Sequence, residues 1–310
     1  MNDAVTGGRA HDALRSIRIG TMVKANAPDP AETVRGLAGL GFESIQPFFW
    51  QTIGNKDVQR LAAEIQAAIG DSGMTVGALG MFGNPLEDRD LDRQTVEGWK
   101  TLIDNAHLFG TDIVAGFTGR LRERPLPESL PRFKQVWGDL ARRAADKGVR
   151  IAFENCAMDG NWASGDWNIA HNPDAWEMMF DALPHENIGL EWEPCHQLVY
   201  LIDPLPQIRK WAPRIFHVHG KDATVRWDVI REHGIFGKVP FVQMRTPGFG
   251  DSDWTRIVSE LRLAGYTGSI DIEGWHDPVY RDALEMTGQV RALEYLKECR
   301  GGEVLVPAAA

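Results

Sequence analysis

The sequence predicts an α/β fold, a closed (β/α)8 barrel with eight parallel strands, and three observations support this fold class. Short apolar runs alternate eight times with longer amphipathic segments, as strands and helices alternate in a parallel barrel. Several amphipathic segments stop at a glycine just before the next apolar run, and glycine supplies the left-handed turn that ends a helix. No glycine-rich phosphate loop follows the first apolar run, which argues against an open doubly wound sheet.

The predicted elements follow the chain in order. Strands are expected at residues 17–23, 42–49, 75–82, 112–117, 150–156, 187–193, 214–219 and 269–273. Helices are expected at residues 31–40, 57–72, 90–109, 128–147, 173–183, 204–211, 252–264 and 282–300. The first helix is well marked, because Asp29 is a good N-cap residue and Pro30 suits the first helical position. The glycines that end helices are Gly41, Gly73, Gly110, Gly148 and Gly265.

The pattern predicts a single barrel domain over residues 1–310, with an N-terminal extension at 1–16 and a C-terminal tail at 301–310. A long stretch without regular periodicity, residues 223–251, follows the seventh strand. A loop of this length is usually functional or disordered. Its apolar and aromatic residues favour an ordered lid or interface; they are Trp227, Ile235, Phe236, Phe241 and Phe249.

Composition restricts the function classes. The chain has 310 residues with a formal net charge of −10, and this charge would repel a nucleic-acid backbone or an anionic lipid surface. The three cysteines are an odd number without paired spacing, as is typical of a reducing compartment. No apolar run approaches the ~18 residues of a membrane span, and the first sixteen residues do not resemble a signal peptide. We therefore expect a cytoplasmic protein without a membrane or nucleic-acid partner.

Four successive predicted strands each end in a side chain that can bind a metal. Strand five ends at Glu154, strand six at Glu193, strand seven carries His219, and strand eight ends at Glu273. Catalytic groups of such barrels stand at the carboxyl ends of the strands, so these four are expected to meet at one mouth. Any one of them has an ordinary explanation as an ion-pair or capping residue. The agreement of all four strand ends predicts a metal site.

The predicted ligands indicate the kind of ion. Carboxylates buried together repel one another, and a bound divalent cation removes that penalty. Three carboxylates and one imidazole suit Mn²⁺ first, then Mg²⁺ or Co²⁺, and Zn²⁺ is also compatible. Side chains alternate along a strand, so Glu191 shares a face with Glu193 and His217 with His219. Glu191 and His217 lie one inward step deeper, and we expect them to support the ligands.

The chain resembles the xylose isomerase-like TIM barrel superfamily, in its branch of sugar phosphate isomerases and epimerases. The resemblance runs from about Ile17 to Arg300. It rests on FENC at 153–156, WEPCHQ at 192–197, HVHGKDA at 217–223, PGFGDSDW at 247–254 and GYTGSIDIEGWHDP at 265–278. In this family a Glu, an Asp, a His and a Glu from strands five to eight bind the metal, which implies Glu154, Glu193, His219 and Glu273. The resemblance also implies a homo-oligomer.

This sequence departs from the family pattern at three places. The strand-six ligand is usually Asp in an Asp-x-x-His pattern, whereas here Glu193 is followed by His196. The ketose 3-epimerases carry a further Glu and an Arg at positions that fall on Gly160 and Val225, the latter beside Arg226. No phosphate cradle is evident. These departures weaken the transfer of a ketose or sugar-phosphate substrate.

The resemblance implies enolisation of a keto-sugar or sugar derivative by a metal-dependent isomerase or epimerase. Glu154 and Glu273 are then the expected base and acid, while His196 and Lys221 orient hydroxyl groups or carry protons. His196 as a loop cap, and Lys221 as a partner of Asp222, are the structural alternatives. Expected substrate contacts are Trp50, Trp162, Trp167, Asp222, Arg226, Trp275 and His276. Barrel packing is the alternative for the tryptophans, and for Trp192 we prefer it.

Three other functions remain open at this stage. The family includes the metal-binding subunits of C-glycoside deglycosidases, so a lyase that cleaves 3-keto-glycosides by elimination is the second reading. It would work with a small β-rich second subunit. An AP endonuclease-like nuclease shares the fold, but the acidic charge and the Glu-rich site disfavour it. A sugar-binding barrel without catalysis is disfavoured, because packing does not require four ligands at four strand ends.

Overall fold

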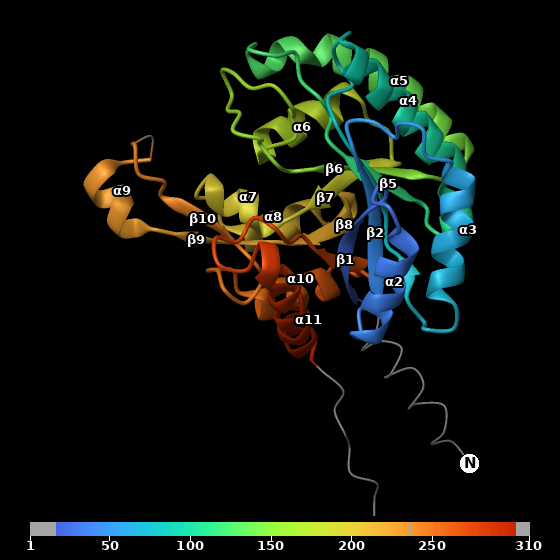
Figure 1. The fold of residues 1–310 in the computed structure, drawn as a ribbon. Coiled ribbons are helices and arrows are strands. Elements are labelled where there is room, and N and C mark those ends of the chain that lie inside the picture. Colours follow the sequence, from blue (N-terminus) through green and yellow to red (C-terminus); the bar gives the residue numbers. More distant parts are fainter. Residues whose placement is uncertain (1–16, 236, 302–310) are drawn as a thin grey trace, which may run out of the picture.

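The computed structural model describes residues 17–235 and 237–301, and it confirms the closed (β/α)8 barrel (Figure 1). Its parallel strands are β1 Arg18–Lys24, β2 Ser44–Trp50, β4 Leu79–Phe82, β5 Ile113–Gly116, β6 Arg150–Glu154, β7 Ile188–Trp192, β8 Ile215–Gly220 and β11 Ser269–Ile272. The order β1-β11-β8-β7-β6-β5-β4-β2 closes through pairing of β1 with β2. The carboxyl ends of all eight therefore meet at one mouth.

Helices cover the outside of the barrel. They are α2 Pro30–Gly39, α3 Val58–Ile69, α4 Asp90–Asn105, α5 Leu130–Asp146, α6 Pro173–Ala182, α8 Pro204–Trp211, α10 Trp254–Leu263 and α11 Glu285–Arg300. Short 3-10 turns occur at Ala106–Phe109, Leu126–Ser129, Ala212–Arg214 and Asp282–Leu284. Asp29 caps α2 as expected, because its side chain accepts a hydrogen bond from the backbone N–H of Glu32 at 2.8 Å. No helix within residues 17–235 and 237–301 is long and apolar enough to cross a membrane.

The structure differs from the sequence prediction at three places. The strand expected at 75–82 divides into β3 Thr75–Val76 and β4, and a side chain at Gly77 between them would collide with Ser269 Oγ, 2.1 Å from an ideal Cβ. A short helix, α7 Pro194–Val199, follows β7 where no helix was expected. The chain after β8 forms a hairpin arm of β9 Asp222–Val225, α9 Trp227–His233 and β10 Val242–Arg245. Figure 1 shows this arm extending beside α7.

The two predicted terminal segments and one lid residue cannot be compared with the structure. Residues 1–16, Phe236 and 302–310 lie outside the described residues. The rest of the long stretch 223–251 contains the regular elements β9, α9 and β10, which account for about half of it. The wide spacing of these short elements explains why the sequence showed no periodicity there.

Aromatic side chains fill the layer between the barrel and its helices around α4 and α5. Trp137 is fully buried, and its ring meets Trp99 edge-on with centroids 4.8 Å apart and Phe153 with centroids 4.5 Å apart. Its indole N–H donates to the carbonyl oxygen of Thr118 at 2.7 Å. Trp137 therefore joins α5 to the ends of β5 and β6, and β6 carries one of the predicted ligands.

Replacing Trp137 with Ala should lower the free energy of unfolding by about 3–5 kcal/mol, because it leaves a large cavity and an unpaired carbonyl. Urea denaturation followed by circular dichroism measures this change. Trp227→Ala is the matched control, since Trp227 on α9 is 52% exposed and its loss should cost less than about 1 kcal/mol. Equal stability of the two variants would contradict the packing described here.

Candidate metal centre and active-site cavity

The four predicted ligands converge at the mouth of the barrel. Glu154 ends β6, Glu193 follows β7 directly, His219 lies near the end of β8, and Glu273 follows β11. Each offers one ligand atom, and these four atoms all lie within 4.8 Å of one another. All four residues are at most 7% exposed. Glu154 and Glu273 are 119 residues apart in sequence, yet the strand ends place three carboxylates and one imidazole around a single point.

Carboxylate oxygens at this point lack ordinary partners. Within the described part of the chain, both oxygens of Glu193 and Oε2 of Glu273 are buried without a hydrogen bond. Glu193 Oε1 is 2.8 Å from His196 Nε2, but this pair is not aligned as a hydrogen bond. Buried carboxylate oxygens are costly unless they are paired or bind a cation. The orphaned oxygens and the oxygen-rich donor set therefore fit a hard divalent cation.

The imidazole of His219 is held so that one nitrogen faces the carboxylates. Nδ1 lies 3.1 Å from Glu154 Oε1 and 3.6 Å from Glu273 Oε2. Nε2 lies 2.7 Å from Gln46 Oε1 and 3.1 Å from Glu191 Oε1, so its N–H is directed away from the centre. This arrangement leaves Nδ1 as the ligand atom, since a metal-binding His commonly donates its other N–H to a buried acceptor.

A second buried polar group lies deeper in the barrel. Glu191, His217 and His219 also place ligand atoms within 4.8 Å of one another. Their polar atoms are largely occupied, however, because His217 Nδ1 lies 2.8 Å from Glu191 Oε1 and His217 Nε2 lies 2.8 Å from Asp271 Oδ2. Gln46 also donates to Glu191 Oε1 at 2.6 Å. Glu191 and His217 thus contact the candidate centre through His219 and lie below it.

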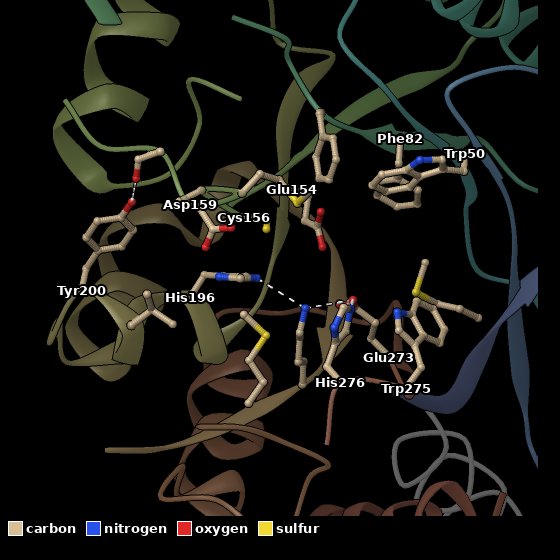
Figure 2. A pocket seen from close by; sticks show the side chains of 18 of the residues that line it. Trp50, Phe82, Glu154, Cys156, Asp159, His196, Tyr200, Glu273, Trp275 and His276 are labelled. Carbon is tan, nitrogen blue, oxygen red and sulfur yellow. Dashed lines mark hydrogen bonds and ion pairs between the residues drawn. The ribbon is translucent and has the colours of Figure 1, made fainter. Parts of the chain in front are cut away.

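Three further basic groups surround Glu273 and Glu193. Lys221 Nζ is 2.8 Å from Glu273 Oε1 and 3.4 Å from His196 Nε2 (Figure 2). His276 Nε2 is 2.9 Å from the same oxygen of Glu273. Lys221 is buried and its partner is Glu273 rather than the neighbouring Asp222, which was the structural alternative. His196, Lys221 and His276 all line the cavity above the centre.

The surroundings shift the pKa values of two carboxyl groups in opposite directions. Burial, opposed by the hydrogen bond from His219 and reinforced by the charges of Glu193 and Glu273, raises the pKa of Glu154 to about 8. Burial would also raise the pKa of Glu273, but Lys221 and His276 outweigh it and hold that pKa well below its usual range. In the absence of a metal, Glu154 is therefore the carboxyl group that keeps its proton near neutral pH.

The metal-free protein should lose stability as the pH rises from about 6 to about 8. Folded Glu154 keeps its proton to about pH 8, whereas its ordinary pKa is 4.5, so the folded state binds more protons than the unfolded state between these values. The free energy of unfolding then falls by up to about 1 kcal/mol per pH unit in this window. Urea denaturation in EDTA at several pH values measures this slope. Glu154→Gln should make the slope shallower, and a stability that rises with pH would contradict the assignment.

The cavity over this centre has a volume of about 980 Å³. Of the expected substrate contacts, it is lined by Trp50, Trp275 and His276, together with Glu154, His196, Lys221 and Glu273. The other four expected contacts are not in its lining; they are Trp162, Trp167, Asp222 and Arg226.

Local structure explains why these four side chains are elsewhere. Asp222 turns into the hairpin arm, where Oδ1 accepts from the N–H of Ser252 at 3.1 Å and Oδ2 accepts from the indole of Trp254 at 3.2 Å. Arg226 pairs on the surface with Asp228 at 2.8 Å. Trp162 is 42% exposed on the loop after β6. Trp167 packs against Trp50, with ring centroids 5.5 Å apart.

Sequence reasoning missed several residues of the site. Gln46 is hydrogen-bonded to His219 and Glu191. The signal in the sequence that could have identified it is that Gln46 is a polar residue in step with Ser44 on an otherwise apolar strand. Asp271 gave the same kind of signal, a polar residue in step with Ser269 on β11, and it was also missed. Phe48, Phe82, Phe117, Asp159 and Tyr200 also line the cavity. The phenylalanines carry no distinguishing signal, because an aromatic residue in a strand usually belongs to the core.

Comparison with known proteins places this chain among related barrels. Inosose dehydratase of Clostridium tetani is 25% identical over 189 residues, which cover 57% of this chain and 59% of that protein. This chain therefore matches less than two thirds of that relative's length. Among solved structures, 3-keto-D-glucoside 4-epimerase from E. coli, in its apo form, superposes with a TM-score of 0.67 at 14% identity, covering 91% of this chain and 100% of the other.

A third relative contains a metal. The xylose isomerase-like TIM barrel protein of Mycobacterium smegmatis in complex with magnesium has a TM-score of 0.68 at 17% identity, covering 93% of this chain and 97% of the other. At these identities the likeness to solved structures shows the fold. The family model described as xylose isomerase-like TIM barrel matches residues 34–299. The chain therefore belongs to the xylose isomerase-like TIM barrel family.

Proposed function

We propose that this protein is a divalent-metal-dependent enzyme that enolises a keto-sugar or sugar derivative and releases an isomer or epimer of it. The observation that carries the proposal is the group of four ligand atoms within 4.8 Å of one another, from Glu154, Glu193, His219 and Glu273, at the floor of a cavity. The epimerase among the structural relatives and the magnesium in another support this choice. Mn²⁺ is the preferred ion, with Mg²⁺, Co²⁺ and Zn²⁺ compatible with the same donors.

When bound, a divalent cation at this centre would supply Lewis-acid stabilisation of negative charge on a substrate oxygen. The chain's own residues supply the proton transfers. Glu154 and Glu273 project from β6 and β11, so a substrate carbon between them could lose a proton to one carboxylate and receive one from the other. His196 lies beside Glu193 and Lys221 lies beside Glu273, and both can donate hydrogen bonds to substrate hydroxyl groups. All four groups are at most 7% exposed, which limits the access of bulk water to them.

A second candidate outcome is elimination, as in a lyase acting on a 3-keto-glycoside. The enolate is the same, but a leaving group on the adjacent carbon departs. A side chain at Gly160 would meet the backbone oxygen of Ala157, 3.0 Å from an ideal Cβ, and Val225 is a buried apolar residue of β9. The positions where the ketose 3-epimerases carry a Glu and an Arg thus offer no polar group here. The match to a dehydratase, an enzyme that removes water, also favours elimination.

Product analysis separates the two outcomes. The Mn²⁺-loaded protein would be incubated in D₂O with a panel of ketoses and with methyl 3-keto-glucoside, and the products followed by NMR and mass spectrometry. An isomerase or epimerase exchanges one carbon-bound hydrogen for deuterium and conserves the carbon and oxygen count. A lyase releases methanol or water. If no substrate of the panel shows either hydrogen exchange or elimination with Mn²⁺ or Mg²⁺, the proposal is wrong.

A further inference from the structure

One wall of the cavity consists of aromatic rings that touch one another. This wall, here called the aromatic compartment, is formed by Phe48, Trp50, Phe82, Phe117 and Trp275. Phe48 stacks on Trp275 with ring centroids 5.7 Å apart, and Phe82 meets Phe117 edge-on with centroids 5.3 Å apart. Trp50 meets Phe117 edge-on with centroids 6.1 Å apart. The rings come from β2, β4 and the segments after β5 and β11, so the sheet itself positions them.

The aromatic compartment lies directly beside the candidate metal centre. Phe82 and His219 have ring centroids 6.2 Å apart. Figure 2 shows Trp50, Phe82 and Trp275 to one side of Glu154 and Glu273, with His196 on the other side. The side chains around the candidate centre form a polar end of the cavity next to this aromatic end, and further apolar residues such as Val199, Phe241 and Met244 line the remainder. A ligand that contacts both ends must have both characters.

A sugar ring fits the polar end and not the whole cavity. Its hydroxyl groups need hydrogen-bond partners when they leave water, because burying an unpaired hydroxyl is unfavourable. The phenylalanines of the aromatic compartment offer no donor or acceptor, whereas Glu154, His196, Lys221 and Glu273 do. A volume of about 980 Å³ is also close to the upper end for drug-sized ligands. One sugar ring at the polar end leaves the aromatic end free for a second group.

The backbone adopts a left-handed conformation at or next to two of the aromatic residues. Trp275 has a φ of 52°, and Gln51, the residue after Trp50, has a φ of 60°. Such left-handed conformations are unfavourable in a residue other than glycine and persist only where the surroundings fix the backbone. At Gln51 they are fixed by hydrogen bonds, since its N–H donates to the Phe82 carbonyl at 2.7 Å and its carbonyl accepts from Thr95 Oγ1 at 2.7 Å.

We propose that the aromatic compartment binds an aryl group attached to the sugar, so that the substrate class is aryl glycosides and not free or phosphorylated sugars. The placement of the sugar at the polar end rests on the proposed function. A phosphate is disfavoured because the cavity lining includes Asp159 with Glu154 and Glu273, while Lys221 is paired with Glu273. The other lining lysine, Lys24, lies over the Trp275 ring at 5.8 Å from its centroid.

Calorimetric binding of unreactive glycosides tests this proposal. The Mn²⁺-loaded protein should bind 4-nitrophenyl β-D-glucoside at least about tenfold more tightly than methyl β-D-glucoside, a difference of about 1.4 kcal/mol, because the aryl group contacts several aromatic rings at once. Glucose 6-phosphate should bind no more tightly than the methyl glycoside. In Trp275→Ala and, separately, Phe117→Leu, the preference for the aryl glycoside should fall to within about threefold.

Controls make the result specific. Trp227→Ala removes a tryptophan outside the cavity lining and should keep the full preference. Melting temperature and Mn²⁺ binding of the two cavity variants show whether they fold. Equal affinity for the aryl and methyl glycosides, a preference that survives both cavity variants, or no binding of either glycoside would each overturn the proposal. Because these ligands do not react, the result is independent of the product analysis, whose failure would contradict the enolisation alone.

Discussion

Glu273→Gln should lower kcat by about a thousandfold or more, which leaves no activity measurable in a routine assay. The substitution removes a carboxylate that is both a candidate ligand and a candidate proton-transfer group, and a general base alone typically contributes about 10²–10⁴-fold. It also leaves Lys221 buried without its carboxylate partner, 2.8 Å away in the native protein. Glu154→Gln should have a comparable effect, because Glu154 occupies the matching position on β6. Steady-state kinetics and hydrogen exchange in D₂O, on the substrate found by product analysis, measure the change.

The control for these variants is Glu177→Gln. Glu177 lies on α6, where it pairs with Lys210 on the surface, so its loss should leave kcat unchanged within about twofold. Metal content of each purified variant, measured at saturating Mn²⁺, separates loss of the ion from loss of the proton-transfer group. A Glu273→Gln enzyme that turns over at the native rate would contradict the mechanism, whatever its metal content.

Removal of the metal should abolish turnover and lower the melting temperature. EDTA leaves three buried carboxyl groups and one imidazole around a common point, and the binding energy of the cation no longer stabilises the folded state. A ligand at about a thousand times its Kd stabilises the folded state by about 4 kcal/mol, so Mn²⁺ should restore both properties. Differential scanning fluorimetry with parallel activity assays follows the restoration.

His219→Ala provides a direct comparison for the metal experiment. It removes the candidate imidazole ligand and should make the melting temperature nearly insensitive to Mn²⁺. His107→Ala changes an exposed residue of the 3-10 turn Ala106–Phe109 and should respond like the native protein. Full turnover by protein shown to be metal-free would exclude the proposed role of the cation.

The sequence predicts the candidate centre well, because the centre depends on two simple regularities. Parallel barrel strands bring their carboxyl ends to one mouth, and alternating side chains decide which residues face inward. Glu154, Glu193, His219 and Glu273 obey both rules. The same rules fail for Asp222, because the chain leaves the barrel at that residue and enters the hairpin arm.

Other parts of the site depend on tertiary structure that local patterns do not reveal. Helix α7 has only six residues, too few for helical periodicity to be recognised, and it begins at Pro194 directly after Glu193. The cavity lining combines β2, β4 and the segments after β5 and β6, which are distant in sequence. Gln46 could be noticed as a polar residue in an apolar strand, but its partners on β7 and β8 could not be identified without the fold.

The position of Gln46 has a consequence for assembly of the protein. All four candidate ligands lie at residue 154 or later in the chain, yet His219 is held by a side chain of β2, which reaches across the barrel interior to β7 and β8. A nascent or fragmented chain that lacks a docked β2 would contain every donor atom without the orientation of its imidazole. High metal affinity would therefore indicate that the barrel has closed, and a chain with an incomplete barrel would bind the ion weakly.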